Sequence, residues 1–188
     1  MKGRSGCSGS RRARFGLQAC CCFDLRAHKG ERQAAPEMPV STSEPISSYG
    51  NDALCQITDF HSPNVHWIFQ GGNRQDVKAA LDWLTERTQA LRSIYPKPLL
   101  VKEHGMPSGP DPFTEALQSN YWAQVLQRVP NSTNQSVVFF EAFDLPFKTI
   151  TQQSELASTE AHWGAWDKDR RPKPVLTAFP LQQARRTQ

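Results

Sequence analysis

The chain has few cysteines outside its first residues and no long apolar stretch. Three of its five cysteines are consecutive, and only Cys55 lies beyond residue 37. Consecutive cysteines fit neither the ligand spacing of a zinc site nor a disulfide framework, so we expect no metal site and no cofactor. No apolar run approaches the ~20 residues that a transmembrane helix needs, so we expect no membrane span.

Residues 38–188 also lack an excess of either charge, because the basic residues are concentrated at the N-terminus. Residues 1–37 hold eight Lys and Arg but only three Asp and Glu, a net charge of +5, while the whole chain carries +4. The remainder therefore carries −1 and offers no basic surface to nucleic acid, whose binding would rest on residues 1–37 alone. We expect residues 1–37 to be a disordered basic leader and residues 38–188 to be the folded domain, with no nucleic acid as partner.

The leader lacks a complete export signal. Its "SRRARF" is similar to a twin-arginine start and its "LQAC" to a lipobox, yet the apolar part "GLQACCCF" is short and Asp24 and Arg26 follow it. A signal peptide needs a longer apolar region and a small-residue cleavage site. We therefore predict no signal peptide and leave the localisation open. The leader is either a disordered extension or sequence from upstream of the true start.

After residue 37, short β-type runs alternate with helical patterns, which is typical of an α/β protein with a parallel sheet. The helical patterns repeat apolar residues at i, i+3, i+4 and i+7. Asn73 is the expected N-cap of the first long helix, Pro96 its stop, and Asp111 with Pro112 the start of the second. The expected strands are 38–45, 54–69, 97–103 and 137–143, and the expected helices are 74–95, 111–129 and 177–185.

The two long helices should each bury one face. The expected core residues of the first are Val77, Ala80, Leu81, Leu84, Thr88, Leu91 and Ile94 or Tyr95. Those of the second are Phe113, Ala116, Leu117, Tyr121, Val125 and Leu126 or Val129.

Three glutamates, Glu44, Glu103 and Glu141, stand at the ends of expected strands, each followed by Pro or Gly within a few residues. The carboxyl ends of parallel strands meet at one face, where barrels of such units place their active sites. Carboxylates among loop aromatics suggest sugar chemistry, since glycoside cleavage needs carboxyl groups as acid and as base or nucleophile. The alternative is solvated charge with aromatics of the core. The aromatics are Trp67, Phe69, Phe143, Phe147, Trp163 and Trp166.

Several motifs in order resemble one enzyme family. "EHGMPSG" is similar to the pattern E-x-G-W-P-S-x-G of glycoside hydrolase family 17, "FFEAFDLPFK" to its F-E-A-F-D-x-P-W-K, and "EAHWGAWDKDRRPKP" to its E-x-H-W-G-L-F-x-x-D-R-x-P-K. "PVSTSEP" resembles the strand-five segment of the family's bacterial branch, so the resemblance extends over roughly residues 38–180. It implies strands five to eight of a (β/α)8 barrel and retaining chemistry on β-1,3-glucan.

The resemblance also implies roles for individual residues. Glu103 would be the nucleophile, with Gly105, Pro107, Ser108 and Gly109 shaping the loop after it. His61 and His66 lie on or beside an expected strand, and each is expected to be a hydrogen-bonded structural histidine or, for His66 in particular, a sugar contact, since no cluster of metal ligands accompanies them. The other residues expected to bind the substrate, or to orient the nucleophile, are Glu141, Asp144, Lys148, Glu160, His162 and Trp163.

The sequence departs from the family in two ways. Met106 and Phe147 replace tryptophans, and no Asn-Glu pair, which carries the family's general acid on strand four, occurs anywhere. Residues 38–188 suffice for four or five βα units of about 30 residues, which favours the C-terminal half of a barrel. We expect marginal stability and self-association through open sheet edges. An impaired glycosidase and an inactive fragment or degenerate β-glucan-binding module both remain open; family members are often secreted or envelope-associated.

Overall fold

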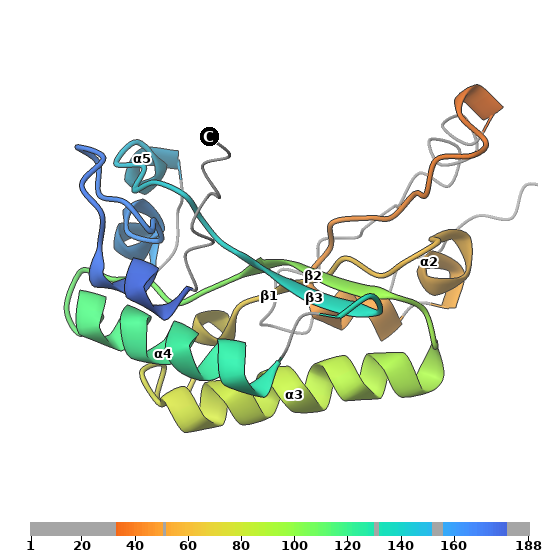
Figure 1. Ribbon diagram of the computed structural model, residues 1–188, viewed down its shortest axis with the longest axis horizontal. Helices are drawn as coiled ribbons and strands as arrows, with labels where there is room; N and C mark the ends of the chain where they lie inside the picture. Colours follow the sequence, from red (N-terminus) through yellow and green to blue (C-terminus); the bar gives the residue numbers. More distant parts are fainter. Residues whose placement is uncertain (1–32, 51, 130–131, 152–155, 180–188) are drawn as a thin grey trace, which may run out of the picture.

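A three-stranded parallel sheet organises the fold of the computed structural model, which describes residues 33–50, 52–129, 132–151 and 156–179. The strands are β1 (Asn64–Val65), β2 (Leu99–His104) and β3 (Gln135–Phe139), in the spatial order β1-β2-β3. The two long helices, α3 (Val77–Ile94) and α4 (Glu115–Arg128), lie side by side along one face of this sheet (Figure 1). This arrangement confirms the expected α/β class and the parallel sheet.

The remaining elements are all short. They are η1 (Ile46–Gly50), α2 (Asp52–Ile57), η2 (Trp67–Gln70), α5 (Lys148–Thr151), η3 (Ala157–Ala161) and η4 (Pro174–Ala178). Among the residues that the structure describes, no helix combines the length and apolar character that a membrane crossing requires.

The core lies between the sheet and the long helices. Leu99 and Val101 of β2 are almost fully buried, as is the expected inner face of α3 from Ala80 to Leu91. Of the two residues expected at the last position of that face, Ile94 is 67% exposed, whereas Tyr95 is partly buried and packs against the core. On α4 the prediction misses two fully buried residues, Gln118 and Trp122, and Ala116 is exposed.

The strand expected at 54–69 is largely wrong. Residues Leu54 to Ile57 belong to α2, the strand itself is only Asn64–Val65, and η2 follows at once. Pro63 precedes β1 and has no N–H to contribute to a ladder, although its carbonyl accepts from Lys102 N at 3.1 Å. The regular ladder therefore forms only over the two residues beyond the proline, which face Glu103 and His104 of β2, while His61 before it makes an isolated parallel bridge with Leu99.

The strand expected at 38–45 forms no regular ladder. Its single bridge is the parallel pair of Pro45 with Asn64, and Asn64 N donates to the Glu44 carbonyl at 2.8 Å. Upstream, side chains make the contacts: Ser41 Oγ donates to the Phe60 carbonyl at 2.6 Å, and Ser62 Oγ to the Thr42 carbonyl at 2.5 Å. Hydroxyl groups that bond the backbone compete with a strand ladder, which explains the irregular edge.

The termini of the elements also differ from the expectations. Asp76, not Asn73, caps α3 by accepting from Ala79 N at 2.9 Å, and Thr114, not Asp111, caps α4. β3 ends at Phe139, because Glu141 N donates to the Trp163 carbonyl instead of continuing the ladder. The C-terminal helix expected at 177–185 is the 3₁₀-helix η4 as far as it is described; positions 180–185 and leader residues 1–32 lie outside the described residues.

Candidate active site

Glu103 lies near the carboxyl end of β2, with its side chain 27% exposed. Its register partner on β1 is Asn64, and His66, which directly follows β1, lies close to the carboxylate. His66 Nε2 is 3.7 Å from one carboxylate oxygen, and Lys102 Nζ is 2.9 Å from the other. The glutamate is therefore partly enclosed between two nitrogen-bearing side chains.

These neighbours hold Glu103 in its charged form. The polar contact with His66, followed by the hydrogen bond and charge of Lys102, lowers the pKa of Glu103 to about 2, although partial burial acts in the opposite direction. A carboxylate that attacks an anomeric carbon must be ionised. Glu103 meets this requirement across the whole neutral pH range.

A second carboxylate, Glu141, follows β3 and is paired with a lysine. Lys148 Nζ lies 2.6 Å from Glu141 Oε1, and both side chains are at most 20% exposed. The ammonium group also lies over the Phe140 ring, 4.6 Å from its centroid. The contacts of Lys148 thus hold Glu141 at the end of β3 and compensate its charge.

Glu160, in η3, is the third carboxyl group of this region. Its pKa is raised, first by burial and further by the negative charges of Glu141 and Glu103, while Lys148 and His66 oppose the rise. Glu160 therefore keeps its proton to higher pH than an ordinary glutamate, whereas Glu103 loses it early. Environments that separate the pKa values of neighbouring carboxyl groups are typical of acid–base sites.

Two aromatic rings pack against the His66 imidazole. Trp163 and Phe140 meet the imidazole edge to face, with ring centroids 5.0 Å and 5.4 Å away. Trp163 is only 1% exposed, so it packs against His66 and has no free ring face for a sugar. Its Nε1 and His66 Nδ1 have no hydrogen-bond partner among the described residues.

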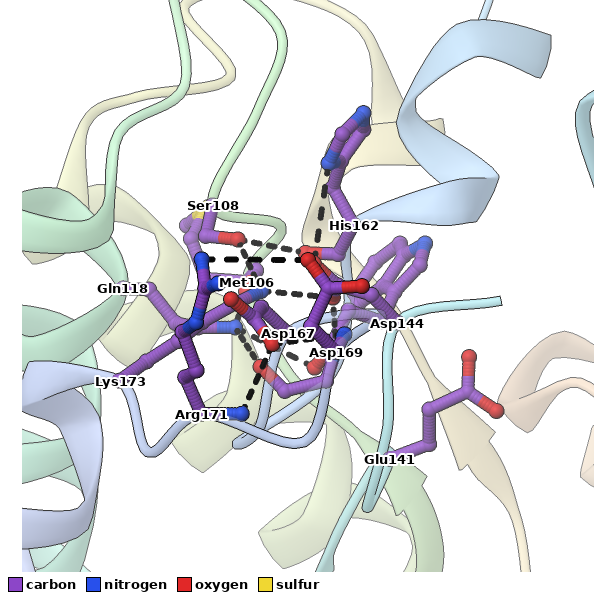
Figure 2. Close-up of polar contacts among 12 residues, drawn as sticks. Met106, Ser108, Gln118, Glu141, Asp144, His162, Asp167, Asp169, Arg171 and Lys173 are labelled. Carbon is purple, nitrogen blue, oxygen red and sulfur yellow. Dashed lines mark hydrogen bonds and ion pairs between the residues drawn. The ribbon is translucent and has the colours of Figure 1, made fainter. Parts of the chain in front are cut away.

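Asp144 belongs to a separate polar cluster, shown in Figure 2. Its Oδ1 accepts from Lys173 Nζ at 2.6 Å and from Gly164 N at 2.9 Å, and Lys173 Nζ also donates to Ser108 Oγ at 2.7 Å. Lys173 is 5% exposed. In Figure 2 the Glu141 side chain lies apart from these residues. The cluster thus ties the loop after β2 to the last loop of the domain.

His162 and Gln118 complete this connection. The His162 carbonyl accepts from both the backbone N and the Oγ of Ser108, while its ring, 42% exposed, has Nδ1 3.9 Å from Asp144. Gln118 Nε2, fully buried on α4, donates to the carbonyls of Met106 and Trp163 at 3.1 and 3.2 Å (Figure 2). Asp144 and His162 therefore act mainly in holding loops in place.

Gly105 allows the chain to turn directly after the catalytic candidate. A Cβ at this position would lie 2.6 Å from the Phe140 carbonyl oxygen and 3.2 Å from the Trp163 ring. Glycine is thus required by the close approach of the β2 loop to the backbone beside Glu141.

Sequence reasoning missed three residues of this region: Lys102, Gln118 and Lys173. The charged run "DKDRRPK" is typical of a solvated turn, which is correct for Asp167 to Arg171 but wrong for Lys173. A signal was present for Gln118, since a polar residue at the i+4 position from Thr114 and next to an apolar face is a candidate for a buried hydrogen-bond donor. His61 lies apart from this region, with its Nε2 beside the Tyr95 carbonyl.

A family profile for the BtgE/BtgC glycoside hydrolase domain matches residues 25–164, which is most of the chain. The chain belongs to the BtgE/BtgC glycoside hydrolase domain family. No protein with a curated description shows significant similarity to this family member. In the part of the chain that the structure describes, no group of three or more His, Cys, Asp or Glu is arranged to hold a metal ion.

Several solved structures similar to this BtgE/BtgC domain are glycoside hydrolases. The β-D-glucuronidase of Dictyoglomus thermophilum has a TM-score of 0.63 at 20% identity, over 81% of this chain and 27% of the enzyme. The glycoside hydrolase family 17 β-1,3-glucanosyltransferase of Rhizomucor miehei has a TM-score of 0.61 at 23% identity, over 80% of this chain and 55% of the enzyme. An active-site mutant of the latter was solved with laminaritriose. The domain thus shares their fold but spans only about half or a quarter of their length.

Proposed function

We propose that this chain is part of a family 17-type glycoside hydrolase that acts on β-1,3-glucan, with strands five to eight of a (β/α)8 barrel. Glu103 is the nucleophile of a retaining, double-displacement reaction. The observation that carries the proposal is the ionised Glu103 between His66 and Lys102, at the carboxyl end of a parallel strand. The similarity to the β-1,3-glucanosyltransferase of Rhizomucor miehei supports the glucan substrate.

In this reaction a Glu103 oxygen forms a bond to the anomeric carbon, and the bond from that carbon to the leaving oxygen breaks. The leaving oxygen takes a proton from a general acid. A water molecule, or the hydroxyl group of a second sugar, then displaces Glu103, and the same acid, now a base, accepts the proton. Lys102 and His66 stabilise the carboxylate before attack and release it as its charge is lost to the ester.

The neighbouring carboxyl groups bind the sugar hydroxyls. Glu141, neutralised by Lys148, accepts hydrogen bonds from hydroxyl groups, and Glu160 donates one when protonated. The exposed part of the His162 ring can contact sugar at the mouth of the site. Trp163 acts through His66, because it is buried behind that ring.

A second candidate function is a β-glucan-binding module without turnover. It is favoured by the absence of an Asn-Glu pair from the sequence, which leaves no counterpart of the family's strand-four proton donor. General acid catalysis is worth about 10²–10⁴ in rate. Natural glucans, whose leaving groups need protonation, should therefore be hydrolysed slowly or not at all by this chain.

The two functions are separated by a substrate that needs no acid. A 2-fluoro glucoside with a dinitrophenolate leaving group should esterify Glu103, and mass spectrometry after digestion would locate the sugar on the peptide that contains it. The matched control is Glu103→Gln, which keeps the shape but should not be labelled. Binding of laminari-oligosaccharides by calorimetry without any labelling of Glu103 would reject the enzyme and favour the binding module. Labelling of another residue would reject Glu103 as nucleophile.

A further inference from the structure

His104, the residue after Glu103, is fully buried and bonded at both ring nitrogens. Its Nδ1 lies 2.6 Å from the carbonyl oxygen of Val65, and its Nε2 lies 2.7 Å from the hydroxyl oxygen of Tyr121. Three elements are therefore joined at this imidazole: β1 through Val65, β2 through His104 itself and α4 through Tyr121.

The partners define the state of the ring. A carbonyl oxygen can only accept, so Nδ1 carries a proton and donates it to Val65. Tyr121 is protonated, because burial raises the pKa of its hydroxyl group, and it therefore donates to a bare Nε2. Burial lowers the pKa of His104 to about 3, against the effect of the Val65 carbonyl, so the ring is neutral.

His104 and Val65, which the Nδ1 hydrogen bond joins, are the chain neighbours of the proposed nucleophile and of His66. His104 is adjacent to Glu103 in β2, and Val65 is adjacent to His66, whose Nε2 approaches the Glu103 carboxylate. The bond from His104 to Val65 extends the short ladder between these strands at its last register pair. A change in this bond would shift Glu103 relative to His66.

We propose that His104, held in its Nδ1-protonated form by Tyr121, is a positioning residue that sets the contact between Glu103 and His66. This inference rests on the proposed function for its catalytic meaning, but the contact itself can be measured without a substrate. The groups that face the Glu103 carboxylate are His66 and Lys102, and the charge of Glu160 is also coupled to it. Lys102 precedes Glu103 on the same strand, whereas His66 follows Val65, which is the residue that His104 bonds.

The first test is the tautomer in the wild-type chain. A long-range ¹H–¹⁵N spectrum of the full-length protein should show His104 with a protonated Nδ1 and a bare Nε2 from pH 5 to 8. A ring protonated at Nε2, or one that becomes doubly protonated in that range, would overturn the proposal. This measurement requires no variant and therefore no assumption about folding.

The second test follows the ionisation of Glu103 by ¹³C NMR of its carboxyl carbon. His104→Leu removes both bonds and should raise the pKa of Glu103 by about one unit or more, a tenfold change in proton affinity. His104→Asn keeps a donor near the Nδ1 position and should shift the pKa by less than half as much. Tyr121→Phe, which removes only the hydroxyl group, should give a smaller rise and a mixture of His104 tautomers.

The control is Leu91→Ala, which empties a buried position near the far end of α3. This variant should lower stability without moving the pKa of Glu103. If Leu91→Ala raised the pKa of Glu103 as much as His104→Leu does, the effect of His104 would be that of any core residue and the proposal would fail. An unchanged Glu103 pKa in both His104→Leu and Tyr121→Phe would also overturn the proposal. If the Glu103 pKa rises in the His104 variants but Glu103 is not labelled by the fluoro glucoside, the positioning role of His104 stands and only the proposed enzyme is rejected.

Discussion

At the scale of single residues, charge and burial decide what each carboxyl group of the site can do. Glu103 and Glu160 have the same side chain, yet contact with His66 and Lys102 lowers the pKa of one and burial raises that of the other. The sequence places both at motif positions but contains no sign of this difference. Only the neighbours within a few ångströms create it.

The lowered pKa of Glu103 predicts how stability changes with pH. A carboxyl group whose pKa is lower in the folded than in the unfolded chain stabilises the fold above its unfolded value, near 4.5, and loses that contribution as pH falls towards about 2. Glu103→Gln should therefore reduce the free energy of unfolding at pH 7 by about 1–2 kcal/mol, a value moderated by solvent screening. The difference from wild type should shrink between pH 4.5 and 2.

Chemical denaturation at several pH values measures this difference. Asp169→Asn is a suitable control, because its carboxylate is paired with Lys168 on the exposed turn and should contribute little. A constant difference between wild type and Glu103→Gln from pH 7 to pH 2 would show that Glu103 is not held in its charged form by these neighbours.

At the scale of elements, the loops that follow β2 and β3 depend on one buried ion pair. Lys173 brings Asp144 and Ser108 together from positions far apart in the sequence, and its side chain is 4% exposed. Loss of one partner from a buried pair leaves the other charge without compensation, which is more costly than loss of the pair.

Lys173→Met should consequently lower the free energy of unfolding by about 3 kcal/mol, since it leaves Asp144 buried and unpaired. The double variant with Asp144→Leu should be less destabilised than the sum of the two single variants. Lys168→Met is the matched control from the same turn, where the lysine side chain is 64% exposed, and should change stability by less than about 0.5 kcal/mol. Additive effects of Lys173→Met and Asp144→Leu, measured in urea, would disprove the coupling.

At the scale of the whole molecule, the sheet has edges on both sides. Among the described residues, no strand pairs with β3 on the side away from β2, and the segment 38–45 covers β1 with a single bridge. The solved family 17 transferase continues over a length of which this chain covers 55%. Under the proposed partial barrel, both edges are places where further strands would pair.

We accordingly expect residues 38–188 alone to be marginally stable or to self-associate. Urea denaturation should show a free energy of unfolding below about 5 kcal/mol, the lower limit of ordinary domains, or a midpoint that rises with protein concentration. Sedimentation velocity would detect the associated species directly. A monomer with a cooperative transition well above that value would contradict the partial barrel with open edges.

The sequence by itself determined the local elements and the order of the motifs. The long helices, β2 and the position of Glu103 at its tip follow from apolar periodicity and from Pro and Gly at the boundaries, which act over a few residues. The expected strand at 54–69 was largely wrong because α2 occupies its first residues and Pro63 interrupts the pairing between the His61 bridge and the two-residue ladder of β1. A β-type composition cannot reveal where a ladder finds partners.

The tertiary structure alone decided which polar residues are buried and what they contact. The local sequence predicts an exposed Lys173, since it follows charged residues in a turn, but the side chain is buried because it contacts Asp144 and Ser108. The motif around His104 likewise gives no sign that its ring is buried and bonded to Val65 and Tyr121. Such contacts join segments distant in the chain, so their energies depend on the packing of the whole domain and not on local pattern.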